Sequence, residues 1–91
     1  MELFTFIMEY LGGTYISQVE AKDKEQARDT WIRNLEVKEI ESFTIMDKED
    51  IIKENFSDED LVLIKGMKSV WFFMVETKKG NGHVNLIKTK L

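Results

Sequence analysis

His83 is the only histidine of this chain, and histidine is the side chain most often used as a general acid or base. Catalysis by such a group requires that a third residue holds it in place. No spacing of serine, aspartate or glutamate around His83 selects such an arrangement. His83 follows a glycine-rich segment, where a solvated loop residue is the ordinary interpretation. We therefore expect no enzymatic activity and no catalytic residue.

The acidic middle of the chain raises the question of a metal site. A calcium-binding loop that starts at Asp47 would need glycine at its sixth position, where Ile52 stands. The chain has no cysteine, so thiolate metal sites and disulfides are excluded. The segment Gly80-Asn81-Gly82 lies between two expected strands, whereas a phosphate-binding loop needs a helix after it. We expect neither a metal nor a cofactor.

Lysines accumulate in the last third of the chain. Residues 61–91 carry one acid and six lysines, which are Lys65, Lys68, Lys78, Lys79, Lys88 and Lys90. Aromatic side chains edged by lysine can stack bases and neutralise phosphates, and Trp71 and Phe73 share a face of an expected strand. Residues 36–60, with ten acids against three bases, would repel phosphate. Single-stranded nucleic-acid binding is therefore the alternative function.

Length and composition predict one globular domain over residues 1–91, because 43% of the residues are hydrophobic and 33% are charged. The apolar run at 3–8 is short and has an acid on each side, so we expect no secretory signal. No segment approaches the ~20 apolar residues that a membrane span needs. We expect a soluble cytoplasmic protein without a membrane partner.

Gly12-Gly13 separates two alternating segments, at about 2–11 and 14–21. A two-residue loop at these glycines would place Tyr10 opposite Tyr15. Eight side chains would then point to one face: Phe4, Phe6, Met8, Tyr10, Tyr15, Ser17, Val19 and Ala21. A slip of one residue would break up this face, so we expect this register.

A helix is expected over 23–35, because Asp23 and Gln26 have the spacing of a capping box. An apolar stripe at helical spacing is formed by Ala27, Trp31, Ile32 and Leu35. The side expected to face solvent holds Arg28, Asp29 and Arg33. The stripe predicts that this helix packs on the sheet.

The middle of the chain gives weaker signals. Residues 39–46 form either a short strand or an irregular crossing, because their apolar residues alternate poorly. Asp47 and Asp50 have the spacing of a helix start, which predicts a short helix over 48–55. A second start signal at 57–60 predicts one further turn.

Two more strands are expected at 70–77 and 84–89. A tight turn at Asn81-Gly82 and a five-residue loop over 78–82 give opposite pairings, and both remain open. The first of these strands is apolar on both faces, whereas a small antiparallel sheet normally has one face exposed to solvent. Its second face must therefore be covered by residues 36–66, by another subunit or by a ligand.

These elements predict the α+β class, with a four-stranded antiparallel sheet built from two β-hairpins in the order β-β-α-(α)-β-β and a main helix on one face. The sheet has more apolar surface than one helix can cover, and such patches mark interaction sites. We predict a non-enzymatic protein-binding module, namely an adaptor, inhibitor or regulatory protein. Its partner would be another protein or a second copy. The candidate contact residues are Ile7, Ile16, Trp71, Phe73, Asp58, Glu59 and Asp60.

Overall fold

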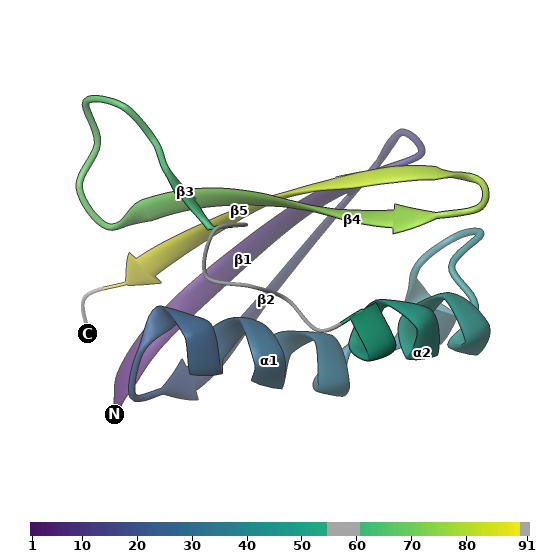
Figure 1. The fold of residues 1–91 in the computed structure, drawn as a ribbon, viewed down its shortest axis with the longest axis horizontal. Helices are drawn as coiled ribbons and strands as arrows, with labels where there is room; N and C mark the ends of the chain where they lie inside the picture. Colours follow the sequence, from purple (N-terminus) through teal and green to yellow (C-terminus); the bar gives the residue numbers. More distant parts are fainter. Residues whose placement is uncertain (55–60, 90–91) are drawn as a thin grey trace.

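The computed structural model describes residues 1–54 and 61–89. In chain order its elements are β1 (Glu2–Tyr10), β2 (Gly13–Ala21), α1 (Lys24–Asn34), the 3-10 helix η1 (Val37–Glu39), α2 (Ile45–Glu54), β3 (Val62–Leu63), β4 (Val70–Thr77) and β5 (Gly80–Thr89). Two β-hairpins, β1–β2 and β4–β5, thus flank a helical middle, as Figure 1 shows. The predicted α+β class is confirmed. None of the described helices is long and apolar enough to cross a lipid bilayer.

The sheet has five strands in the order β2-β1-β5-β4-β3, and all the neighbours are antiparallel. The expectation of four strands missed β3, which pairs Val62 with Phe72 and Leu63 with Trp71. A strand of two residues is too short to show an alternating pattern, so only its pairing with β4 reveals it. The two long hairpins meet in the middle of the sheet, where β1 lies beside β5.

The β1–β2 hairpin places the predicted residues on one face, but its register differs from the expected one by two positions. Tyr10 pairs with Gly13 rather than with Tyr15, so the turn is Leu11-Gly12. Both turn residues have positive φ, 45° for Leu11 and 85° for Gly12, as a type I′ turn requires. Because side chains alternate with a period of two, this shift leaves all eight predicted side chains on the same face.

The β4–β5 hairpin turns at Lys78-Lys79, so both expected registers are wrong. Strand β5 begins at Gly80 and continues through Gly82, which is buried. A Cβ atom on Gly82 would lie 2.7 Å from Val75 Cγ2 and 3.2 Å from Met8 Sδ. The Asn-Gly pair therefore lies inside a strand, and the glycine makes room for close packing rather than for a turn.

Helix α1 begins after the predicted cap, Asp23, but the Gln26 side chain reaches back to the residue before the cap rather than to the cap itself. The backbone N–H of Gln26 donates to Asp23 Oδ1 at 2.8 Å, and the backbone N–H of Lys22 donates to Gln26 Oε1 at 2.7 Å. The apolar stripe of α1 faces the sheet, with Ala27, Trp31 and Ile32 buried. The predicted helix and its buried side are confirmed.

Arg28 departs from the expectation that it faces solvent. Its side chain is buried, with the guanidinium carbon 5.6 Å from the centre of the Phe73 ring. Arg28 lies four residues before Ile32, so the two side chains share one face of the helix. A planar guanidinium can pack on an aromatic ring, which lets this face include a charged residue.

Helix α2 begins earlier than predicted because Thr44, rather than Asp47, is its cap. Thr44 Oγ1 accepts a hydrogen bond from the backbone N–H of Asp47 at 3.1 Å, and Asp47 Oδ2 accepts one from the backbone N–H of Thr44 at 2.9 Å. The residues before the cap form η1 and a turn, so this part of the chain is an irregular crossing. The further turn expected at 57–60 lies outside the described residues.

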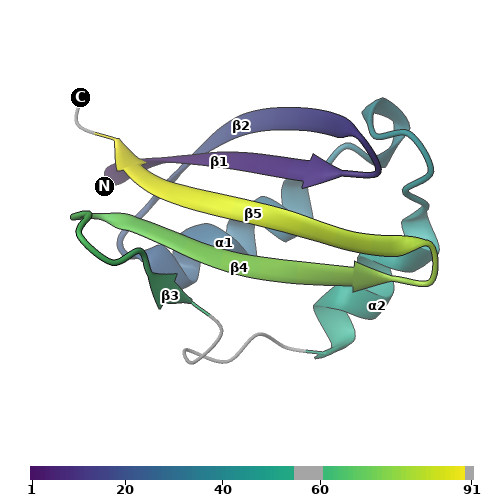
Figure 2. The same cartoon turned by 90° about the horizontal axis from the view of Figure 1, so that it is seen from above.

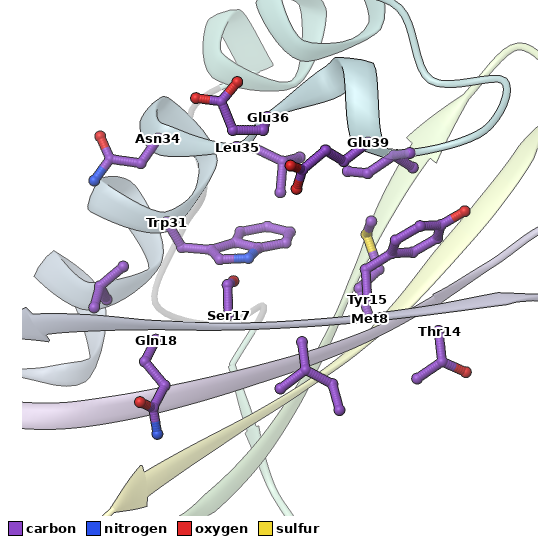
Figure 3. Close-up of a pocket in the computed structure, with 13 residues that line it drawn as sticks. Met8, Thr14, Tyr15, Ser17, Gln18, Trp31, Asn34, Leu35, Glu36 and Glu39 are labelled. Carbon is purple, nitrogen blue, oxygen red and sulfur yellow. The ribbon is translucent and has the colours of Figure 1, made fainter.

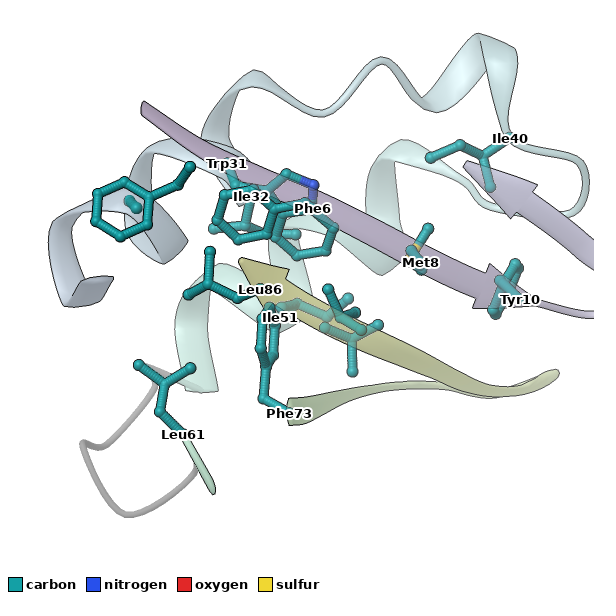
Figure 4. Packing of buried hydrophobic residues seen from close by; sticks show 14 of the residues in the cluster. Phe6, Met8, Tyr10, Trp31, Ile32, Ile40, Ile51, Leu61, Phe73 and Leu86 are labelled. Carbon is teal, nitrogen blue, oxygen red and sulfur yellow. The ribbon is translucent and has the colours of Figure 1, made fainter. Parts of the chain in front are cut away.

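Both helices cover the same face of the sheet, as Figures 1 and 2 show from two directions. The core between the layers contains an aromatic group of Phe6, Trp31 and Phe73 (Figure 4). Phe6 and Trp31 are stacked with centroids 5.2 Å apart, and the Phe73 ring is nearly perpendicular to both. Among the described residues of 36–66, none lies over the opposite face, so they do not cover it.

Candidate protein-binding site

The face of the sheet turned away from the helices carries a row of apolar side chains. Strand pairing places one row across all five strands: Ile16, Ile7, Asn85, Phe72 and Val62. Four of these five residues are apolar. Figure 2 looks onto this face and shows no described segment in front of it. The strands therefore present an apolar band that the chain's own helices leave open.

Neighbouring rows widen this band. Ile87 pairs with Val70 on one side of the row, and Met74 pairs with His83 on the other. We define the open-face cluster as Ile7, Ile16, Val62, Phe72, Met74 and Ile87. Ile16 is 66% exposed, Val62 is 56% and Met74 is 39%, whereas the other three are half-buried by their neighbours. Contiguous exposed apolar residues of this kind mark interaction sites.

The charged side chains on the open face are acidic. Glu9, Glu20 and Glu76 share this face by strand alternation, and all three are exposed. The only lysine or arginine within the five strands is Lys88, which alternates onto the helix side and pairs with Glu2 at 2.9 Å. The open-face cluster is therefore bordered by negative charge.

His83 lies within β5 rather than in the expected loop. It is exposed on the open face, where it pairs with Glu9 of β1 and Met74 of β4. The centre of its ring is 5.8 Å from that of Phe72. Among residues 1–54 and 61–89, no three histidine or acidic side chains gather closely enough to hold a metal ion.

The structure brings together two of the predicted contact residues and separates the two aromatic ones from them. Ile7 and Ile16 are paired on the open face. Phe73, which is 1% exposed, points into the core, and Trp71 packs half-buried against it. Both aromatic residues lie on the helix side of β4. The expectation that they share a contact surface with Ile7 and Ile16 is therefore wrong. Asp58, Glu59 and Asp60 lie outside the described residues.

The predicted nucleic-acid contacts do not form one basic surface among the described residues. Lys78 and Lys79 form the β4–β5 turn, whereas Lys65 and Lys68 lie in the β3–β4 connection at the other end of the hairpin (Figure 2). Lys79 Nζ donates to the carbonyl oxygen of Ser42 at 3.1 Å. The sixth lysine, Lys90, lies outside the described residues.

Sequence reasoning missed four members of the open-face cluster. Phe72 and Met74 belong to the even-numbered side of β4, and alternation alone could not tell which side of that strand meets the helices. Ile87 lies on β5, whose faces stayed undecided while the hairpin register was open. Val62 lies in β3, which had no detectable pattern. Comparison of the chain with protein-family models, with curated proteins and with solved structures found no match.

Proposed function

We propose that this chain is a non-enzymatic protein-binding module that docks another protein on the open-face cluster. One observation carries the proposal: both helices cover the same side of the sheet, and the other side has an apolar band whose central row is interrupted only by Asn85. Covering such a band with a partner removes apolar surface from water, which is worth roughly 25 cal/mol per Å² before the costs of association. The band crosses all five strands, so it offers a broad contact area.

The charges around the cluster indicate the chemistry of the partner. Glu9, Glu20 and Glu76 would lie at the rim of the interface, where like charges on a partner would weaken association. A second copy in face-to-face packing would bring further carboxylates to this rim. We therefore propose a foreign protein with an apolar contact patch that is bordered by lysine or arginine.

Asn85 adds a condition on the partner. Its half-buried carboxamide lies in the central row between Ile7 and Phe72. A partner that covers this group without hydrogen bonding to it would bury a polar group at a cost. The partner's contact patch should therefore present a hydrogen-bonding group near the middle of its apolar surface.

Site-specific photo-crosslinking in the native host tests the proposal. A photoreactive phenylalanine analogue is placed at position 16 or 74 on the open face and at position 49 on the exposed surface of α2. We expect the first two positions to capture the same protein and position 49 to capture none of it. The captured protein is then purified, and its affinity is measured by calorimetry.

Two exposed isoleucines provide matched variants for that measurement. Ile16→Lys changes the open face, and Ile45→Lys changes α2, where Ile45 is 55% exposed. We expect Ile16→Lys to raise the Kd at least about tenfold, because Ile16 lies in the proposed interface. Ile45→Lys should leave the Kd within about twofold, because Ile45 lies outside it. Equal effects of the two variants, or no common captured protein, would refute the proposal. If the chain instead crosslinks to itself and sediments as a dimer, the partner is a second copy of the chain and not a foreign protein.

Single-stranded nucleic-acid binding, the alternative function, has less support. Trp71 lies on the covered side of β4, with Lys24 Nζ 5.6 Å from its ring centre, so it is not a free stacking platform. Titration of a mixed-sequence oligonucleotide at low salt tests this alternative, because electrostatic binding is strongest there. Saturable binding that Lys78→Glu and Lys79→Glu abolish would favour it over the protein-binding proposal.

A further inference from the structure

The outer edge of β2 is open to an additional strand. A two-residue turn closes on a hydrogen-bonded pair, here Tyr10 and Gly13, so the alternation of the ladder makes every second residue of β2 bond to β1. The N–H and C=O groups of the residues between them point away from the sheet; these residues are Thr14, Ile16, Gln18 and Glu20. β2 is the terminal strand of the sheet, and no described segment pairs with this edge. An extended peptide could therefore bond to these four alternate residues of β2.

A groove of about 380 Å³ runs along this edge between β2 and the C-terminal end of α1 (Figure 3). Its apolar lining includes Trp31 from α1, Leu35 directly after that helix and Tyr15 from β2. Ser17, a small residue on the helix-facing side of β2, lies beneath Trp31 in Figure 3 and leaves space there. Because side chains of an added strand also alternate, every second one would enter this groove.

The groove is acidic at its rim. Glu36 and Glu39 line it, both exposed, and Figure 3 shows the Glu39 carboxylate directed toward the opening between Trp31 and Tyr15. Among residues 1–54 and 61–89, no lysine or arginine lines it. An apolar side chain flanked by basic ones therefore matches the groove, because the flanking residues two positions away lie on the same side of a strand.

We propose that β2 captures an extended, basic peptide segment of a partner protein as a sixth strand, with one aliphatic side chain of that segment in the groove. The backbone edge supplies affinity, and the groove supplies specificity. The groove lies on the side of β2 that faces the helices, whereas the open-face cluster lies on the other side; the two sites share Ile16 at the edge. A second copy fits less well. If two β2 strands paired antiparallel about a two-fold axis between them, Glu36 and Glu39 of both copies would lie on the same side of the joined sheet, where like charges repel.

The probe is the heptapeptide acetyl-Thr-Lys-Thr-Leu-Thr-Lys-Thr-amide, which places one leucine between two lysines on one face of a strand. Its Kd is measured by NMR titration of the full chain. We expect saturable binding below about 1 mM. We also expect slower hydrogen exchange at the amides of Thr14, Ile16, Gln18 and Glu20 alone, because the alternate amides of β2 are already bonded to β1.

Two variants change the two halves of the site. Ser17→Leu fills the groove from within. Gln18→Pro removes an outward N–H without removing a backbone bond to β1; like the control Gln18→Thr, it also removes the hydrogen bond that Gln18 Nε2 donates to Thr5. Each should raise the Kd of the probe at least about tenfold. Gln18→Thr is the matched control for the edge, and Met74→Lys, on the open face, should leave the Kd within about twofold. Met74→Lys thereby separates this proposal from the one for the open-face cluster.

Three results would overturn the proposal. The first is the absence of saturable binding. The second is binding that neither Ser17→Leu nor Gln18→Pro weakens, each variant having a native spectrum. The third is equal binding of the same peptide with glutamate in place of lysine. If the chain sediments as a dimer and Gln18→Pro dissociates that dimer, the occupant of the edge is β2 of a second copy and not a peptide of a partner protein.

Discussion

The indole of Trp31 lies flat on the ring of Phe6, with the ring centroids 5.2 Å apart and the planes 6° from parallel. This contact joins α1 to the central part of the sheet, because Phe6 belongs to β1 and pairs with Leu86 of β5. The Phe73 ring is nearly perpendicular to both, with its centroid 6.4 Å from that of Phe6 and 5.5 Å from that of Trp31. The three rings thus join the two hairpins and the main helix in one packed group.

Trp31→Ala should cost about 3–5 kcal/mol of unfolding free energy, because it leaves a large cavity in this group. Small domains have about 5–15 kcal/mol in total, so the variant should be close to unfolding. Trp31→Phe keeps an aromatic ring and should cost less. Urea denaturation of both variants gives the two values. A cost for Trp31→Ala no greater than that for Trp71→Ala, at a half-buried position, would contradict the described core.

Leu11→Asn should stabilise the chain by about 0.5–1 kcal/mol, because Leu11 has a φ of 45° and asparagine tolerates this region better than leucine. The substitution also creates an Asn-Gly turn at the position where the hairpin turns. Leu11→Ala, which removes the side chain without favouring positive φ, is the control and should give no gain. Thermal denaturation of the three chains measures the difference. A loss of stability in Leu11→Asn would place the turn elsewhere.

Gly82→Ala should cost about 1–3 kcal/mol, because the new Cβ would overlap with Val75 and crowd Met8. Asn81→Ala, at the exposed neighbouring position, should stay within about 0.5 kcal/mol of the wild type. The pair distinguishes a strand position from a turn position, since an Asn-Gly turn would need both residues. Chemical denaturation is again the measurement. A similar cost for both variants would indicate a turn at these residues.

The pKa of Asp47 lies below its ordinary value of 3.8, chiefly because the backbone N–H of Thr44 donates to its carboxylate and also because Lys79 lies nearby, at 3.7 Å; burial opposes this shift. A depressed folded-state pKa stabilises the fold above the unfolded-state pKa, and this stabilisation is lost as the pH falls through the folded-state pKa. Asp47→Asn should therefore cost about 1 kcal/mol near pH 7 and progressively less at acid pH.

Urea denaturation near pH 7, pH 5 and about pH 2.5 measures this dependence. Asp50→Asn, at an exposed position of the same helix, is the control and should show little change at any of these pH values. A cost for Asp47→Asn that stays constant down to the lowest pH would show that the carboxylate charge does not contribute to the cap.

Much of the local structure was predictable from residue periodicity and end signals. The capping-box spacing of Asp23 and Gln26 predicted the start of α1, and alternation predicted which side of β1 and β2 faces the core. The face assignment survived an error in the turn, because a shift of two residues does not change which side chains share a face. Ile7 and Ile16 were identified as surface apolar residues for the same reason.

The tertiary structure decided how these elements combine. The even side of β4 became the open face because its odd side, with Phe73, packs against α1, and both sides had looked equally apolar in sequence. Arg28 was buried because its side of the helix meets the same ring. Periodicity is a property of neighbours along the chain, whereas the choice of covered face depends on contacts between segments far apart in sequence. For that reason the sequence by itself predicted an excess of apolar sheet surface, and only the folded chain showed where that surface is uncovered.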